Sequence, residues 1–342
     1  MYSFMNDYSE GAHERVLHLL MKSNLEQNAG YGEDLHTMRA KEYIKRQLGD
    51  VNPDIHLIPG GTQTNLLVIS SFLRPHECVI AVETGHINVH ETGAIEATGH
   101  KVVTVKGVDG KITTEGIIDA IKYHTDEHMV KPKMVYISNS TELGTIYSKE
   151  ELLEIHKVCK QYNLILFMDG ARLASALTSR LNDLGLKDIA ELVDVFYIGG
   201  TKNGALLGEA LVILKEELKE DFRYLIKQRG ALMAKGFVVG IGFEALFLDN
   251  LYFELGEHAN RMAKQIEDTL IESGYTFYAT PGTNQLFPII PNVILEDLEK
   301  EFIYSIQKEW DEKSSVIRLV TSFATTTESV EAICNFFINH PF

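Results

Sequence analysis

Short apolar runs and amphipathic segments alternate through the middle of the chain. Six runs have the length and composition of buried strands: CVIAVE (78–83), KVVTV (101–105), MVYIS (134–138), LILFMD (164–169), DVFYI (194–198) and EALVIL (209–214). The segments between them show the apolar spacing of helices, at 114–124, 149–162 and 171–181. Continuous apolar runs are expected of strands that are covered on both faces. The pattern therefore predicts an α/β domain with a mostly parallel sheet between helices.

The two ends of the chain have a different pattern. Three segments read as further helices, at 12–22, 216–228 and 243–272. After the turn PGTNQ (281–285), strand-like runs at 286–290 and 315–323 alternate with helical patterns at 296–308 and 327–338. This mixture predicts a small α+β domain at the C-terminus. We therefore divide the chain into an N-terminal arm and helix (1–22), a large domain (23–250) and a small domain (251–342).

Composition narrows the class of protein. The 342 residues are 45% hydrophobic and carry a net charge of −16, which argues against a general nucleic-acid binder. No apolar run reaches the roughly 18–20 residues of a membrane span, and the first residues lack the pattern of a secretory signal. The three cysteines are far apart and lack the spacing of a disulfide or zinc framework. We expect a reduced, cytoplasmic protein without a nucleic-acid or membrane partner.

Ligands of open α/β sheets bind beyond the carboxyl ends of the strands, so the residues that follow each run are candidates for chemistry. Asp169 ends one run in MDGAR, either as a carboxylate facing a crevice or as a helix N-cap. Lys202 follows another in IGGTKNG. A partly desolvated lysine can form an imine with a carbonyl cofactor, although a solvated turn lysine gives the same pattern.

Two more segments carry weaker signals. Gly60, Gly61 and Thr62 precede a predicted helix that starts near Asn65, where backbone N–H groups suit a phosphate or simply form a turn. His86 and His90 lie four residues apart but lack the third ligand and the HExxH pattern of a metal site, so we predict no metal. We expect the His86 ring to stack on a flat cofactor and His90 to be structural. GIGFEA (240–245) resembles half a dinucleotide fingerprint but does not follow a strand.

Together these parts meet the needs of pyridoxal phosphate. That cofactor requires a lysine for its aldehyde, an acid opposite its pyridine nitrogen, a phosphate cup and a flat group over the ring, and its amino-acid substrate requires an arginine. The order of the motifs resembles the threonine aldolase branch of the fold-type-I enzymes that depend on pyridoxal phosphate, which is also grouped with the β-eliminating lyases. The resemblance runs through NDYSEGAHERVL (6–17), GYGED (30–34), GTQTN (61–65), GHINVHETGA (85–94), ISNSTELGTIYS (137–148), MDGARL (168–173), TKNGALLGEALV (201–212) and IRLVTS (317–322).

The resemblance implies a large cofactor-binding domain with a seven-stranded sheet, and it implies roles for individual residues. Lys202 would bind the cofactor's aldehyde and Asp169 its pyridine nitrogen. The other implied cofactor contacts are Gly61, Thr62, His86, Asn139, Arg172 and Lys227. The implied substrate contacts are Asn6, Tyr31, Arg172 and Arg318, of which Arg318 would pair with the carboxylate. His86 or His128 would act as the base near the substrate hydroxyl.

The chain departs from the family pattern at two places. Asn6-Asp7 stands where the family often has Ser-Asp. Met233-Ala234-Lys235 follows Lys227 where the family commonly has Met-Arg, so Lys235 or Arg229 would have to replace that arginine. The resemblance further implies a dimer or tetramer whose copies share active sites, with Tyr31 approaching the neighbouring site.

The reaction implied by the resemblance is cleavage of a β-hydroxy amino acid, L-threonine or L-allo-threonine, to glycine and an aldehyde. The base takes the β-hydroxyl proton while the Cα–Cβ bond breaks, and the cofactor accepts the electron pair. β-Elimination or racemisation with the same cofactor is the nearest alternative, since the cofactor carries the difficult chemistry. A non-catalytic binding protein of the same fold is a second alternative.

Overall fold

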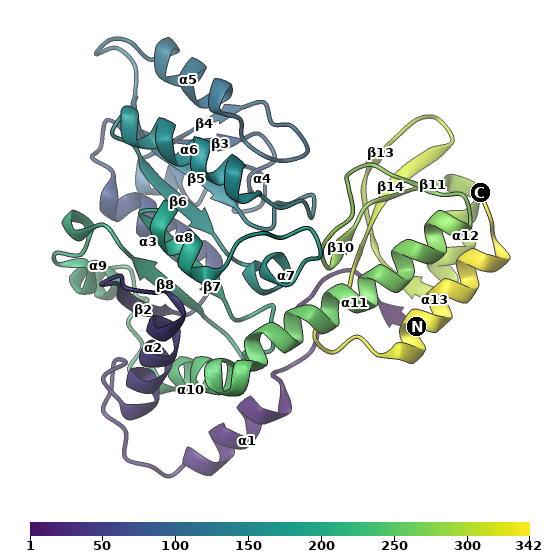
Figure 1. Cartoon of the computed structure of the whole chain (residues 1–342), viewed down its shortest axis with the longest axis horizontal. Helices are drawn as coiled ribbons and strands as arrows, with labels where there is room; N and C mark the ends of the chain where they lie inside the picture. Colours follow the sequence, from purple (N-terminus) through teal and green to yellow (C-terminus); the bar gives the residue numbers. More distant parts are fainter.

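A seven-stranded sheet forms the centre of the large domain in the computed structural model, which describes residues 1–342 (Figure 1). Its strands are β2 (Asp54–Ile58), β3 (Glu77–Val82), β4 (Lys101–Val105), β5 (Lys131–Ser138), β6 (Ile165–Asp169), β7 (Val195–Gly199) and β8 (Glu209–Ile213), in the order β2-β8-β7-β6-β5-β3-β4. Only β8 runs against its neighbours β7 and β2. The mostly parallel sheet is thus confirmed. The hydrophobic pattern did not predict β2, the edge strand with the sequence DIHLI, because a histidine interrupts its apolar residues.

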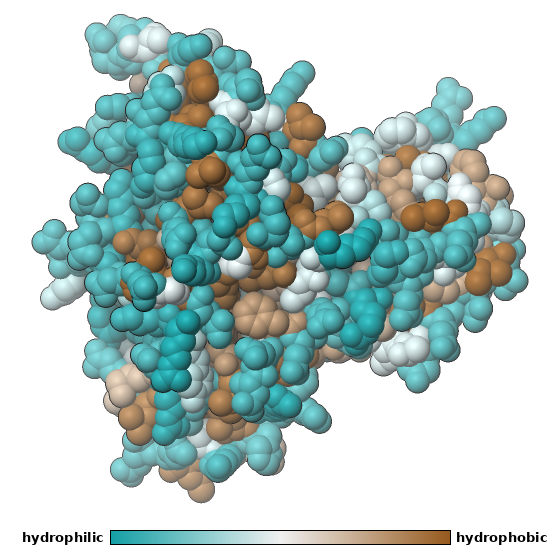
Figure 2. Space-filling model, viewed as in Figure 1, coloured by the Kyte–Doolittle hydropathy of each residue, from teal (hydrophilic) through white to brown (hydrophobic).

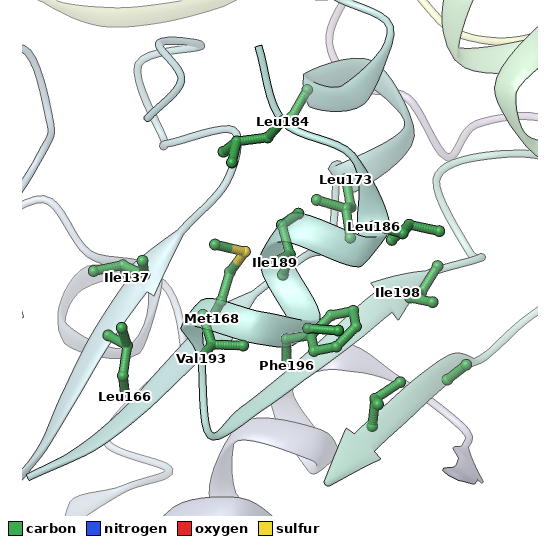
Figure 3. Packing of buried hydrophobic residues seen from close by; sticks show 14 of the residues in the cluster. Ile137, Leu166, Met168, Leu173, Leu184, Leu186, Ile189, Val193, Phe196 and Ile198 are labelled. Carbon is green, nitrogen blue, oxygen red and sulfur yellow. The ribbon is translucent and has the colours of Figure 1, made fainter. Parts of the chain in front are cut away.

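Helices cover both faces of this sheet. The large-domain helices are α1 (Glu14–Ser23), α2 (Leu35–Gln47), α3 (Gly61–Phe72), α4 (His86–Val89), α5 (Thr114–Tyr123), α6 (Lys149–Gln161), α7 (Leu173–Leu177), α8 (Leu186–Leu192), α9 (Phe222–Gln228) and α10 (Phe237–Phe247). Successive residues of β6 enter opposite cores: Leu166 packs with α8 and Phe167 packs with α3 and α9. Figure 3 shows the first of these layers, where Ile189 of α8 faces Met168 and Phe196 of the sheet. This two-sided burial explains the continuous apolar runs.

The small domain has its own sheet and core. Its strands β9 (Thr276–Phe277), β10 (Gln285–Leu286), β11 (Pro288–Pro291), β13 (Ser305–Glu309) and β14 (Ser314–Val320) are antiparallel, and α12 (Asn292–Glu301) and α13 (Thr327–Asn339) pack beside them. The first residues of the chain belong to this domain. β1 (Tyr2–Ser3) pairs with β12 (Phe302–Ile303), and Phe4 is buried in the small-domain core. The predicted arm of residues 1–22 is therefore split between the two domains.

Several predicted helices are shorter than their sequence pattern. The predicted helix 243–272 is broken by Asp249 and Asn250, whose φ angles of 55° and 61° are left-handed. The predicted helix 216–228 divides into a 3₁₀ turn (Glu216–Leu218) and α9. The end of the predicted helix 296–308 is instead strand, because β13 pairs along β14. The segment 171–181 forms helix only in α7. In each case a turn or a long-range pairing overrides local propensity.

One long helix, α11 (Leu251–Glu272), joins the two domains (Figure 1). A 3₁₀ turn (Leu248–Asn250) leads into it from α10. Leu251 and Leu255 at its start belong to the large-domain core, whereas Met262 and Ile266 belong to the small-domain core. The change of core thus lies inside α11 and not at the predicted boundary of 250/251. α11 is the element that fixes the small domain against the large one.

Gly256 allows α11 to approach α7 closely. A Cβ atom at this position would stand 2.7 Å from the backbone carbonyl of Ala174 in α7. We expect Gly256→Val to destabilise the protein by about 1–3 kcal/mol, because the crossing must open. Thermal unfolding would measure the change. Gly11→Val is the matched control, since a Cβ at Gly11 meets no atom within 4 Å, and an equal loss in both variants would contradict the explanation.

The visible face of the molecule is mostly hydrophilic, with brown patches scattered over both domains (Figure 2). None of the helices has the length and apolarity needed to cross a lipid bilayer. The segment GIGFEA lies in α10, where a Cβ at Gly240 would stand 2.4 Å from Thr37 Oγ1 of α2. Gly240 therefore serves the packing of α10 against α2.

Candidate active site

The loops at one edge of the large sheet meet around a cavity of about 530 Å³. The parallel strands β3, β5, β6 and β7 end at this edge, and the antiparallel strand β8 begins there with Glu209 opposite Gly199. β2 leads to the same edge and into α3. Only four of the 21 lining residues are hydrophobic, so the cavity suits a polar ligand. Its size lies within the usual range for small-molecule sites.

Asp169 stands at the end of β6 with three hydrogen-bond donors around it. Its Oδ2 accepts from Tyr136 Oη at 2.6 Å and from Asn65 Nδ2 at 3.1 Å, and its Oδ1 accepts from the N–H of Ala171 at 2.9 Å. Burial works to raise the pKa of Asp169, but the charge of His86 and the hydrogen bonds hold that pKa below its ordinary value. The side chain is therefore a fixed anion on the floor of the cavity.

His86 is oriented by a buried carboxylate. Its Nδ1 lies 2.8 Å from Oε1 of Glu91, and the same oxygen accepts from Asn65 Nδ2 at 2.7 Å. The backbone N–H of His86 donates to Glu142 at 2.9 Å. Because Asn65 also donates to Asp169, its amide group links the His86–Glu91 pair to the Asp169 carboxylate. The imidazole lines the same cavity as Asp169.

Lys202 enters the cavity from the turn after β7. Burial, reinforced by the charge of Arg172, lowers the pKa of the Lys202 amine. Nearby, Glu209 accepts hydrogen bonds from Thr201 Oγ1 at 3.0 Å and from the N–H of Gly200 at 3.1 Å. Burial raises the pKa of Glu209 to about 8. A lowered pKa increases the share of neutral amine at any given pH, and the neutral amine is the form that binds a carbonyl.

The N-terminus of α3 forms another wall of the cavity. Gly60 has an extended backbone (φ −169°, ψ 162°) and gives no side-chain cap, so the first N–H groups of the helix point outward without one. A Cβ at Gly61 would stand 3.3 Å from the Tyr197 hydroxyl, a tight contact that glycine avoids. α3 begins at Gly61, earlier than the predicted start near Asn65. Gly61 and Thr62 thus lie in the first turn, where an anion binds best.

Two arginines line the cavity, Arg172 from the large domain and Arg318 from the small domain. Arg172 forms a two-pronged ion pair with the buried Asp7, with Nε–Oδ2 at 2.7 Å and Nη2–Oδ1 at 3.0 Å. Arg318 comes from β14 and donates to the carbonyl of Met5 at 3.2 Å, while its buried Nε has no partner. Both guanidinium groups line the cavity. Arg318 keeps donors available for an anionic ligand.

Several predicted contacts lie outside the cavity of this chain. Asn139 is fully buried beneath its rim, where its N–H donates to the carbonyl of Asp169 at 2.9 Å. Asn6 folds back on its own turn and accepts from the N–H of Tyr8 at 2.9 Å, so Tyr8 lines the cavity in its place. Lys227 and Tyr31 lie together on the surface, with the Lys227 amine 4.6 Å from the centre of the Tyr31 ring.

The structure does not bring His128 to the cavity of its own chain. His128 is exposed and precedes the first residue of β5, whereas the cavity lies beyond the last residue of that strand. Eight strand residues span about 26 Å. His128 therefore lies near the amino end of β5, at the end of the sheet opposite to the cavity.

Other cavity residues are missed by the sequence reasoning. Asp7, Asn65, Tyr136, Tyr197 and Glu209 all touch the predicted residues or line the cavity. Glu91 and Glu142 flank His86. His90, interpreted as structural, also lines the cavity. The available signal is position, because Glu209 opens a strand at the same edge and Asn65 lies one helical turn after Gly61.

Comparisons with known proteins agree with this geometry. A profile of the β-eliminating lyase family matches residues 9–291. A low specificity L-threonine aldolase of Pseudomonas aeruginosa is 31% identical over 311 residues, which cover 89% of this chain and 86% of the relative. A second L-threonine aldolase, from another Pseudomonas strain, is also 31% identical and covers 90% of this chain and 87% of its own length.

Solved structures share the whole architecture. A threonine aldolase from Leishmania major superposes with a TM-score of 0.98 at 49% identity, and the match covers 100% of both chains. An aspartate aminotransferase variant from Thermus thermophilus has a TM-score of 0.74 at 15% identity, covering 97% of this chain and 89% of that one, which shows a common fold. The predicted fold type I is thus confirmed. The match along most of the chain establishes that this protein belongs to the β-eliminating lyase family.

Proposed function

We propose that this protein binds pyridoxal phosphate and cleaves L-threonine or L-allo-threonine to glycine and an aldehyde. The observation that carries the proposal is that Lys202 and Asp169, from different strand ends, line one cavity together with the N-terminus of α3. The names of the relatives support the same activity. A non-catalytic role fits poorly, because every ionisable group that the chemistry needs is present in that cavity.

The cavity fits this cofactor on its own evidence. The uncapped first turn of α3, with Gly61 and Thr62, would hold the phosphate, and the Lys202 amine would hold the aldehyde. Asp169 would face the pyridine nitrogen, with His86 on the wall above. When bound, pyridoxal phosphate supplies a conjugated ring that accepts electrons from the substrate. A carboxylate held ionised at Asp169 would keep a proton on the ring nitrogen and so favour that acceptance.

The remaining groups would position the amino acid. Arg318 offers a guanidinium with a buried, unpartnered Nε to the substrate carboxylate. Arg172 is already held by Asp7, so it is a fixed positive charge and not a free clamp. Fixing the carboxylate sets the torsion about Cα and therefore chooses which bond breaks. A nearby base must take the β-hydroxyl proton as the Cα–Cβ bond opens.

Incubation of the purified protein with pyridoxal phosphate and L-threonine tests this function. We expect glycine and acetaldehyde in equal amounts, and a visible absorbance that changes when glycine is added. Ammonia with a keto acid would instead indicate β-elimination, and D-threonine or L-alanine inversion would indicate racemisation. Either outcome, or no change in absorbance, would contradict the proposal.

Arg318 should control substrate binding. We expect Arg318→Leu to raise KM for L-threonine by about 10–100-fold, because the carboxylate loses a charge-assisted hydrogen bond. Arg318→Lys should recover part of that loss, since lysine keeps the charge but not the planar fork. Steady-state kinetics would measure both variants. An unchanged KM in both would remove Arg318 from the site.

We further propose that the enzyme is a cytoplasmic homo-oligomer with shared sites. Tyr31 and Lys227 form a pair on the surface, away from their own cavity, and Tyr31 has a left-handed φ of 62° that is unusual for a bulky residue. Exposed apolar side chains on and beside α1 (Leu17, Met21 and Leu25) offer a contact surface. All three cysteines are free thiols, as expected in a reducing compartment.

A further inference from the structure

We propose that His90 is the base that accepts the β-hydroxyl proton of the substrate. The inference rests on the proposed aldol cleavage and names the group that drives it. His90 closes α4, where its N–H donates to the carbonyl of His86 at 2.9 Å. Its ring lies 5.5 Å from the ring of His86, centre to centre, and lines the same cavity as Lys202 and Arg318.

The other two histidines considered for this step are less suited. Nδ1 of His86 is engaged by the buried Glu91, which fixes the orientation of that ring in the cavity lining. His128 lies at the opposite edge of the sheet. His90 is exposed to the cavity, and neither of its ring nitrogens has a hydrogen-bond partner within the chain. Its imidazole is therefore free to meet a substrate hydroxyl.

The charges around His90 favour a neutral ring. Desolvation lowers its pKa, and so do the neighbouring His86 ring on α4 and the positive charges of Arg318 on β14, Arg172 after β6 and Lys202 after β7. The nearby carboxylates are turned elsewhere. Glu91 faces His86 and Asn65, and Glu142 faces Ser138 and the N–H of His86. A histidine whose pKa lies below the ordinary value of about 6.5 is unprotonated at neutral pH.

The proposed cleavage is balanced in protons and electrons. The hydroxyl proton moves to a ring nitrogen of His90, and the O–H electron pair becomes the second bond of the aldehyde C=O. The Cα–Cβ pair stays with Cα, which takes up one proton to give glycine. His90 then returns its proton to solvent, so no oxidant or reductant is consumed. Glycine itself has no β-hydroxyl, so removal of its α-proton does not need His90.

Cleavage of L-threonine and exchange of the glycine α-proton should therefore respond differently to a change at His90. We expect His90→Asn to lower kcat/KM for L-threonine by about 100-fold, within the range for loss of a general base. The fall in wild-type kcat/KM below pH 6.5, caused by protonation of the base, should disappear from the variant. Glycine binding, followed by visible absorbance, and exchange of the glycine α-proton with deuterated water should stay within twofold of wild type. His76→Asn, at an exposed histidine before β3, is the matched control and should match wild type throughout.

Two results would overturn the role of His90. One is cleavage by His90→Asn within fivefold of wild type with an unchanged pH profile. The other is an equal fall in cleavage and in glycine exchange, which would indicate general damage to the site. His128→Ala is measured in parallel, and loss of the acid limb there instead of in His90→Asn would transfer the role to a neighbouring copy. A wild-type protein that binds glycine but never cleaves L-threonine would refute the proposed function itself.

Discussion

Replacing Lys202 with alanine is expected to lower cleavage of L-threonine by about 10⁴-fold or more, the largest effect of any single change considered. The side chain is the one amine that enters the cavity, and its lowered pKa makes it reactive toward a carbonyl. Without it, pyridoxal phosphate would have no covalent attachment. Activity assays and the visible spectrum of the purified variant would measure the loss together.

Chemical trapping separates attachment from folding. Borohydride treatment of the wild-type protein should add the reduced cofactor to the peptide that contains Lys202, and the Lys202→Ala variant should stay unlabelled. Lys157→Ala is the matched control, because that side chain is exposed on α6 and pairs only with Glu154. Full turnover in Lys202→Ala, or label on another lysine, would contradict the assignment.

The sequence pattern captures the large sheet well because its strands are buried on both faces. Five of the six predicted strands match an observed strand to within one residue at each end, and β5 begins three residues before its predicted start. Helices α5 and α6 lie where the periodicity places them. The predicted elements differ from the observed ones where contacts between distant residues override the local pattern. β13 is recruited by β14, and α11 is separated from α10 by two left-handed residues that no periodicity reveals. The edge strand β2 carries a histidine and lacks an apolar run.

The site divides in the same way. Lys202, Asp169 and His86 were predictable because parallel strands bring their carboxyl ends to one edge of the sheet, and Gly61 because small residues precede a predicted helix there. Their partners were not, because the contacts join distant parts of the chain: Asp7 meets Arg172 across 165 positions, and Asn65 meets Asp169 across 104. The eleven-residue spacing between His128 and Asn139 did not show that β5 lies between them. The two residues therefore stand at opposite ends of that strand.

The second large effect is expected at Asp169. Asp169→Asn keeps the shape of the side chain but removes its charge, and we expect kcat to fall by about 10³-fold while the cofactor stays bound. The local hydrogen bonding explains the severity. Tyr136, Asn65 and the N–H of Ala171 all donate to the carboxylate, so an amide NH₂ would face a donor. Steady-state kinetics and cofactor content after denaturation would measure the two quantities.

Tyr136→Phe provides the graded comparison for Asp169. It removes one donor and keeps the anion, so we expect a loss of only about tenfold, the value of one hydrogen bond to a charged group. Because the anion would hold a proton on the cofactor ring in both reactions, Asp169→Asn should slow glycine α-proton exchange as much as cleavage, unlike His90→Asn. Since its pKa is held low, Asp169 should stay ionised down to below pH 4, and no loss of activity above that pH should trace to it. Exchange at the wild-type rate in Asp169→Asn would show that the carboxylate does not support the electron-accepting ring.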